Sequence, residues 1–278
     1  MDTLKLLITD NNLLLSEKGN LLLEKTFESD EESIQLLDPI LKKKNKSRID
    51  CFFSGNRLVS QSRIVSYDAK EYFVADEKTL QGLVDSASHS FLEEHKDVKL
   101  EIIQTGILGI FLNGYRVKEI GKQKVKDMTV SVFLAAMPAG YKKQFKKNVS
   151  FYSFAWHSTE RIKKISKEEE FVVCSAYERS TDISIKKADG FFETLSIPLG
   201  THHIKDNKET FKKNLEEEIG KGLIGLSEGI CLPGHVYLLV ASEFQDIFEG
   251  AFKSDTYHSM CFSEKGFEVT NMSSILNS

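Results

Sequence analysis

The sequence has few cysteines and prolines and no long hydrophobic run, and each shortage excludes a class of protein. Its 278 residues include four cysteines and four prolines. The cysteines form no CxxC pair, which argues against a disulfide framework and a zinc ribbon. We expect free thiols in a reducing cytoplasm, buried at Cys51, Cys174 and Cys231. No run approaches the roughly 18 apolar residues of a membrane span, and the first residues do not resemble a signal peptide.

The sequence also lacks a large excess of either charge, because its 37 basic and 41 acidic residues give a net charge of only −4. Without an overall basic field, nucleic acid is not an expected partner. No GxGxxG, P-loop, nucleophile-elbow or HExxH motif occurs. The adjacent His202 and His203, with Asp206 nearby, would point to opposite sides of an extended chain and indicate a surface loop. We therefore predict neither a metal site nor a catalytic residue.

What the chain does have is a repeated pattern of three short strands. Apolar runs at 4–8, 13–15 and 21–23 are separated by turn-forming residues, and a helical pattern follows. Residues 171–197 repeat the order strand, turn, strand, turn, strand, and again a charged helical pattern follows. Two such copies, each opening one half of the chain, indicate two duplicated α/β lobes.

A compact α+β segment lies between the two repeats. Residues 75–95 have the periodicity of an amphipathic helix, and strand-like runs follow it, two of them joined by the turn formers Asn113-Gly114. We therefore divide the chain into a first lobe (1–66), an inserted α+β subdomain (67–137) and a second lobe (138–278).

The stretch STDISIKKADGFFETLSIPLG, which begins at Ser180, resembles the second phosphate-binding hairpin of the actin-like superfamily. The similarity is to the type represented by the cell-division protein FtsA and the pilus assembly protein PilM. Thr181-Asp182 and Pro198-Leu199-Gly200 match the hairpin pattern of these proteins, and the middle segment resembles the subdomain inserted in their first lobe. The resemblance implies a two-lobed, actin-like (ribonuclease H-like) α/β fold with an inserted α+β subdomain. The short connection before the strand at His235 implies that the small subdomain of the second lobe is missing or reduced.

The nucleotide-binding motifs that the resemblance implies are degenerate. The first phosphate loop reads TDNN, without glycine, and keeps only Asp10. In the second loop the glycines are replaced by Tyr177, Glu178 and Arg179. Such loops hold phosphate with backbone amides that approach closely because glycine lacks a Cβ, and the Glu178 carboxylate repels phosphate. Asp10, Arg179 and Asp182 are the candidate nucleotide-binding remnants, and we expect no bound ATP or Mg²⁺ and no catalysis.

The resemblance and the degenerate motifs together predict a non-catalytic, cytoplasmic scaffold. It would bind the cytoplasmic tail of a membrane protein and so link a membrane-embedded cell-division or type IV pilus assembly complex to its partners. The polar C-terminal stretch lacks the basic amphipathic helix of FtsA-type proteins, so we expect recruitment to the inner face of the membrane without direct insertion. Two alternatives stay open: an actin-like ATPase with a remodelled nucleotide site, and an α+β interaction module unrelated to actin folds.

Overall fold

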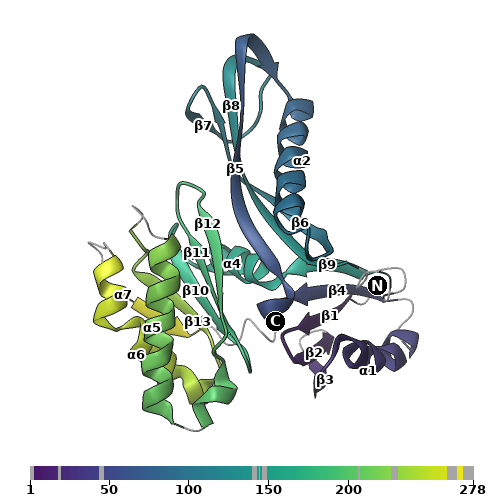
Figure 1. Ribbon diagram of the computed structural model, residues 1–278, viewed down its shortest axis with the longest axis vertical. Helices are drawn as coiled ribbons and strands as arrows, with labels where there is room; N and C mark the ends of the chain where they lie inside the picture. The colour runs from purple at the N-terminus through teal and green to yellow at the C-terminus, as the bar shows by residue number, and fades with distance from the viewer. Residues whose placement is uncertain are drawn as a thin grey trace.

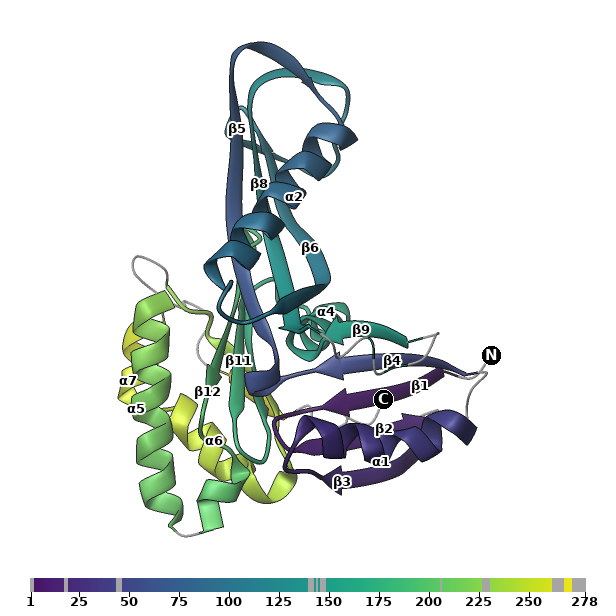
Figure 2. The ribbon, with the colours of Figure 1, turned by 45° about the vertical axis from the view of Figure 1, so that its right-hand side comes forward.

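Two five-stranded sheets and one four-stranded sheet organise the described part of the chain (Figures 1 and 2). The computed structural model describes residues 3–17, 20–43, 47–139, 143, 145, 149–205, 207–226, 231–261 and 268–271. Asp206 and the C-terminal stretch after Asn271 lie outside the described residues. No helix in the described part of the chain has the length and hydrophobicity needed to span a lipid bilayer.

The first lobe is built on a sheet with the strand order β3-β2-β1-β4-β9. The first three strands form an antiparallel meander, and β4 and β9 extend the sheet in parallel. The predicted strands at 4–8, 13–15 and 21–23 are confirmed. The elements of this lobe are β1 (Thr3–Ile8), β2 (Asn12–Glu17), β3 (Asn20–Thr26), α1 (Asp30–Lys43), β4 (Arg48–Phe53) and β9 (Val149–Ser153).

The second lobe repeats this arrangement with the strand order β12-β11-β10-β13-β14. Again three antiparallel strands are followed by two parallel ones, so the duplication predicted from the sequence is confirmed. The connection from α5 to β13 is short, as expected. The elements are β10 (Phe171–Ala176), β11 (Thr181–Lys186), β12 (Phe192–Ile197), α5 (Lys208–Leu226), β13 (His235–Leu239), α6 (Gln245–Phe252), α7 (Asp255–Met260) and β14 (Glu268–Asn271).

Helix α4 (Phe154–Ile165) lies between the two sheets (Figure 1). It begins where the Ser153 hydroxyl accepts a hydrogen bond from the Trp156 amide at 3.3 Å. Its buried face shares one apolar cluster with both sheets. The cluster contains Leu7 and Phe52 from the first sheet, Phe154 and Ile162 from α4, and Phe171, Val173, Tyr177 and Leu239 from the second lobe. Burial of this shared surface fixes the two lobes face to face.

The inserted module projects from the first lobe as a long twisted sheet covered on one side by a helix (Figure 2). It comprises β5 (Val59–Ala75), α2 (Glu77–Glu94), β6 (Leu100–Leu112), β7 (Tyr115–Val117) and β8 (Gln123–Pro138), in the sheet order β5-β8-β6-β7. The predicted apolar face of α2 is buried at Leu80, Leu83, Val84, Ala87 and Phe91. The predicted hairpin turn at Asn113-Gly114 joins β6 to β7, with positive φ at both residues.

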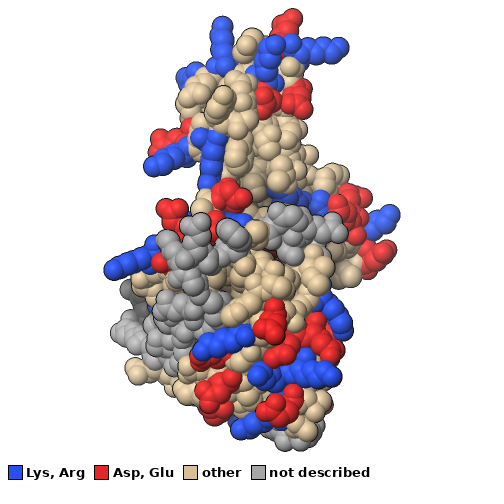
Figure 3. Space-filling model, turned by 90° about the vertical axis from the view of Figure 1, so that its left-hand side faces the viewer, with Lys and Arg blue, Asp and Glu red and all other residues tan. Residues whose placement is uncertain are grey.

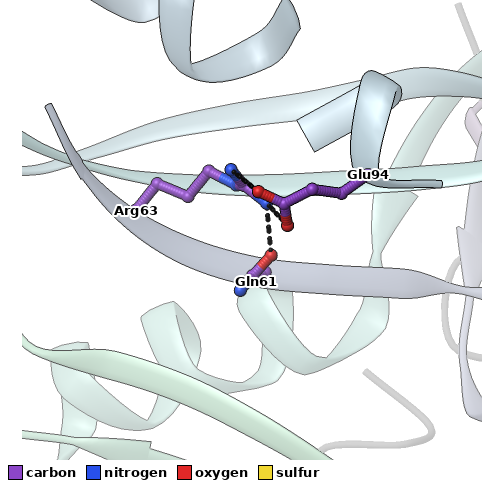
Figure 4. Close-up of polar contacts among 3 residues, drawn as sticks. All are labelled: Gln61, Arg63 and Glu94. Atoms are coloured by element: carbon purple, nitrogen blue, oxygen red, sulfur yellow. Dashed lines mark hydrogen bonds and ion pairs between the residues drawn. The ribbon is translucent and has the colours of Figure 1, made fainter. Parts of the chain in front are cut away.

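An arginine on the edge strand ties β5 to the end of α2 (Figure 4). Arg63 Nη1 donates to Glu94 Oε1 at 2.8 Å, and Arg63 Nη2 donates to Gln61 Oε1 at 2.9 Å. The guanidinium also lies over the Phe91 ring, 5.6 Å from its centroid. Hydrogen bonding by Arg63 lowers the pKa of the Glu94 carboxyl, so the pair is charged at neutral pH. These contacts brace the inserted module along its free edge.

Two strands cross the limits drawn from the sequence. The division into 1–66, 67–137 and 138–278 stays a prediction, but β5 begins at Val59 and pairs with β8 of the inserted sheet. Strand β9, which follows the inserted module, pairs with β4 of the first lobe. No strand was predicted at β9, because this five-residue element carries too short an apolar run to be recognised beside α4.

The cysteine prediction is correct for two thiols and wrong for a third. All four cysteines are free, and Cys51 and Cys174 are buried. Burial raises the pKa of both thiols, which keeps them protonated. Cys231 is exposed. Its apolar neighbourhood misled the prediction, because the adjacent Leu232, and not Cys231, turns into the core.

Candidate functional site

The carboxyl ends of β1, β4 and β10 meet at the junction between the lobes. The turn after β1 contains Asp10 and Asn11, and β4 is followed by Ser54 and Gly55. The loop after β10 runs from Tyr177 to Ser180. Because each lobe contributes the same edge of an equivalent sheet, the two loops predicted as degenerate phosphate loops face one another.

Asp182 joins the second lobe directly to the first. Its carboxylate oxygen Oδ2 accepts hydrogen bonds from Ser54 Oγ at 2.9 Å and from the Gly55 amide at 3.1 Å. Both contacts are buried, and Asp182 is only 4% exposed. Gly55 has φ of +66° and lies against Asp10, where a Cβ would be 2.9 Å from both Asp10 Cγ and Ser180 Oγ. A glycine is therefore needed at this point for the lobes to approach.

The tips of the two loops are also bonded to one another. Asn11 Nδ2 donates to Glu178 Oε2 at 2.9 Å across the junction. On the first-lobe side, Arg57 Nε donates to the backbone carbonyl of Asp10 at 3.1 Å. The Arg57 guanidinium also packs 4.7 Å above the centroid of the Phe27 ring. The loop after β1 is thus bonded to Arg57 of its own lobe and to Glu178 of the second lobe.

Backbone amides in both loops are engaged within their own turns. The Thr9 amide donates to the Asn12 carbonyl at 2.9 Å, and the Asn12 amide donates to Thr9 Oγ1 at 3.2 Å. In the other loop the Tyr177 amide donates to the Ser180 carbonyl at 2.8 Å. A phosphate cradle requires such N–H groups to point at the ligand. Here these amides are committed to holding the turns.

Burial controls the ionisation of the groups at the junction. It raises the pKa of Asp182, and the hydrogen bonds from Gly55 and Ser54 partly oppose that rise, while the Asp10 carboxylate adds to it. Tyr177 is 8% exposed, and burial together with Asp182 raises the pKa of its phenol well above the usual value. Tyr177 packs against the Phe154 ring at a centroid distance of 6.4 Å, so its ring belongs to the core between the lobes.

Two of the three remnant residues come together and the third does not. Asp10 and Asp182 both lie against Gly55, close enough for their charges to interact. Arg179 is exposed at the outside of the loop. Sequence reasoning missed Asn11, Ser54 and Gly55. The one local signal was the Ser54-Gly55 pair directly after the buried strand β4, because a glycine in such a place often marks the close approach of another part of the chain.

These residues do not fit a Mg-ATP site. The carboxylates of Asp10, Glu178 and Asp182 lie in or beside the two facing loops, and like charge disfavours a phosphate between them. Within the described residues, Asn11 Oδ1 is a further buried acceptor without a hydrogen-bond partner. No group of three or more His, Cys, Asp or Glu among the described residues is arranged to hold a metal. The arrangement closes the junction by direct contact between the lobes.

The histidine pair lies beside the loop after β10, next to Glu178. His202 and His203 belong to a short 3-10 helix, Thr201–Lys205, and not to an extended chain. His203 Nδ1 is 3.1 Å from the Gly200 amide and accepts its hydrogen bond. His202 Nδ1 lies 3.9 Å from the Glu178 carboxylate, and its side chain is exposed. The expected position at the surface is confirmed for both histidines, which are exposed.

Comparison with known proteins finds this chain similar to actin-like structures. No family model matches it, and no curated protein matches it in sequence. A PilM–PilN type IV pilus biogenesis complex matches with a TM-score of 0.63 and 13% identity, over 100% of this chain and 90% of that one. A protein of Bacteroides thetaiotaomicron with an actin-like ATPase fold and unknown function matches with a TM-score of 0.53 and 10% identity, over 99% and 94%. At these identities the likeness concerns the fold.

Proposed function

Because this chain has the actin-like fold that its sequence predicted, we propose that it is a non-catalytic scaffold of the cytoplasm. In this role it binds the cytoplasmic tail of a membrane protein in a type IV pilus assembly or cell-division complex and connects that complex to further partners. It works at the inner face of the cell membrane without inserting into it. The likeness to the PilM–PilN complex over the whole chain supports the pilus branch of this proposal.

One observation carries the non-catalytic part of the proposal: the two lobes are bonded to one another where an actin-like protein would hold its nucleotide. Asp182 bonds Ser54 and Gly55, and Glu178 bonds Asn11. A scaffold without ATPase activity needs only a stable surface for its partners. The hydrogen bonds between the lobes stabilise the arrangement of the two lobes without a ligand. An ATPase that used Asp10, Arg179 and Asp182 would first have to break them.

Mg-ATP is expected to leave the thermal midpoint of the protein unchanged. A ligand at 100 times its dissociation constant adds roughly 2.7 kcal/mol of stability, which is readily seen as a shift of the midpoint. The measurement is a thermal melt with and without millimolar Mg-ATP, with Mg-ADP as a second ligand. A reproducible upward shift with either nucleotide would contradict the proposal and favour the ATPase.

In its own cells, the tagged chain is expected to sediment with the membrane fraction through a protein partner. Alkaline carbonate, which strips peripheral proteins, should release it, because no lipid-spanning element is invoked. Strains that lack the pilus assembly membrane proteins should lose the sedimentation, and strains depleted of division membrane proteins serve as the matched comparison. If the chain stays in the supernatant of lysed wild-type cells, the scaffold proposal is wrong. Loss only in the division strains would reassign it to that complex.

A further inference from the structure

A charged cleft lies between the inserted module and the second lobe, away from the junction described above. Its volume is about 750 Å³. One wall consists of β6 and β7, and the other of the end of α4 with the segment after it and the end of β11. Figure 3 shows this side of the molecule, with Lys, Arg, Asp and Glu side chains around the waist between the module and the lobe.

The walls of the cleft are held in place by an arginine that spans them. Arg116 Nη1 donates to the Ala188 carbonyl in the second lobe at 2.6 Å, and Arg116 Nη2 donates to the Leu108 carbonyl in β6 at 3.1 Å. On the far wall, Glu170 Oε1 accepts a hydrogen bond from the Ala188 amide at 3.2 Å. The cleft is therefore preorganised, so a ligand does not have to bring the two bodies together.

Cations outnumber carboxylates in the lining of the cleft. Two acidic residues, Glu168 and Glu169, face six basic ones: Arg116, Lys118, Lys163, Lys167, Lys186 and Lys187. Glu168 Oε2 also lies 3.7 Å from His235 Nε2, outside the group of lysines. Lys187 Nζ donates to the Cys231 carbonyl, a neutral acceptor, at 2.9 Å. The lining thus carries an excess of positive charge.

Lys186 shows the consequence of that excess. Burial lowers the pKa of its ammonium, and the charge of Lys163 lowers it further. Glu160 opposes this shift, Arg116 adds to it by a smaller amount, and Asp189 has the smallest opposing effect. A cation held partly buried beside two other cations is stabilised by any anion that enters. The geometry of the cleft and this mutual repulsion both favour a negatively charged ligand.

The same walls also carry apolar surface. In the β6 wall Ile107 is 48% exposed, whereas its neighbours Leu108 and Ile110 are 9% and 8% exposed. A free phosphate or a nucleotide phosphate would use the cations and leave this surface wet. A polypeptide with acidic and apolar residues covers both kinds of surface at once, as interfaces with an apolar centre and a charged rim do.

We propose that this cleft binds an acidic, partly apolar segment of a partner polypeptide, with Lys163 and Lys167 on one wall and Lys118 on the other as carboxylate-binding residues. The inference rests on the proposed scaffold function, since it assigns the surface through which the chain holds a partner. The three lysines are exposed, so they are available to a ligand and contribute little to the folded state.

The test uses a short fluorescein-labelled peptide of alternating Glu, Ser and Leu residues, and its Gln-for-Glu counterpart. The Glu peptide should bind the full chain by fluorescence anisotropy, with an affinity that falls as salt is raised. The double variant K163Q/K167Q should weaken binding at least about tenfold, because two charge-assisted contacts are lost. The matched control K96Q/K213Q replaces two exposed lysines outside the lining of the cleft and should bind like the wild type.

Several outcomes would overturn the assignment. The assignment is wrong if the Glu peptide fails to bind, if the Gln peptide binds equally well, or if K163Q/K167Q binds as the wild type does. Displacement of the peptide by lower concentrations of tripolyphosphate or a single-stranded oligonucleotide would replace the acidic peptide with phosphate or nucleic acid. Peptide binding and membrane sedimentation are independent readouts. If the peptide does not bind but the chain still sediments with membranes, only the cleft proposal is wrong. If the peptide binds but the chain does not sediment with membranes, the scaffold function is wrong.

Discussion

Replacing Gly55 with alanine is expected to lower the free energy of unfolding by about 3 kcal/mol. An L-residue at φ of +66° costs on the order of 1–2 kcal/mol, and a Cβ forced against Asp10 and Ser180 adds an overpacking cost of about 1–3 kcal/mol. The measurement is a urea titration followed by the fluorescence of Trp156, the only tryptophan of the chain. The loss reports how tightly the two lobes are closed on one another.

Gly114 supplies the matched control for this substitution. It also has positive φ, +79°, but a Cβ added there meets nothing within 4 Å. Gly114→Ala therefore carries the backbone cost alone, about 1 kcal/mol. The difference between the two variants isolates the crowding at the junction. Equal losses would mean that the lobes do not meet closely at Gly55.

Removing the Asp182 side chain is expected to cost about 2–4 kcal/mol of folding free energy. Asp182→Ala leaves the Ser54 hydroxyl and the Gly55 amide buried without an acceptor, and an orphaned buried donor is more expensive than a lost surface contact. Hydrogen exchange supplies a local readout, because the Gly55 amide should lose its protection in the variant. The same urea titration gives the global loss.

Two further variants separate the hydrogen bonds from the charge. Asp182→Asn keeps an acceptor oxygen in place and should cost only about 1 kcal/mol. Asp97→Ala removes an exposed aspartate from a turn of the inserted module and should change stability by no more than about 0.5 kcal/mol. If Asp182→Asn destabilised as much as Asp182→Ala, charge and not the acceptor would hold the lobes together.

The sheets could be predicted from the sequence because their strands are short apolar runs bounded by turn formers. The meanders at 4–8, 13–15, 21–23 and 171–197 were found in this way, and so was the buried face of α2. Local pattern was sufficient for these elements because the residues that define each one are close in sequence.

The junction could not be predicted because it is made by residues distant in sequence. Ser54 and Asp182 are 128 positions apart, and Asn11 and Glu178 are 167 apart. Neither pair has a local sequence pattern, and each contact depends on the relative position of the two lobes, which pack together around α4. Tyr177 shows the same limit. It looked like a bulky obstruction in a turn, yet its ring completes the core beside Phe154.

The placement of β9 has a consequence for how the protein forms during synthesis. Ile49 in β4 pairs with Val149 in β9, and the whole inserted module lies between them in the sequence. The first sheet therefore keeps β4 as an open edge until the ribosome has made the module and the strand after it. Closing so long a loop is slow, and an unpaired edge strand is open to wrong partners in the meantime. The inserted module, continuous in sequence, is the part that can fold first and bring the two strands together.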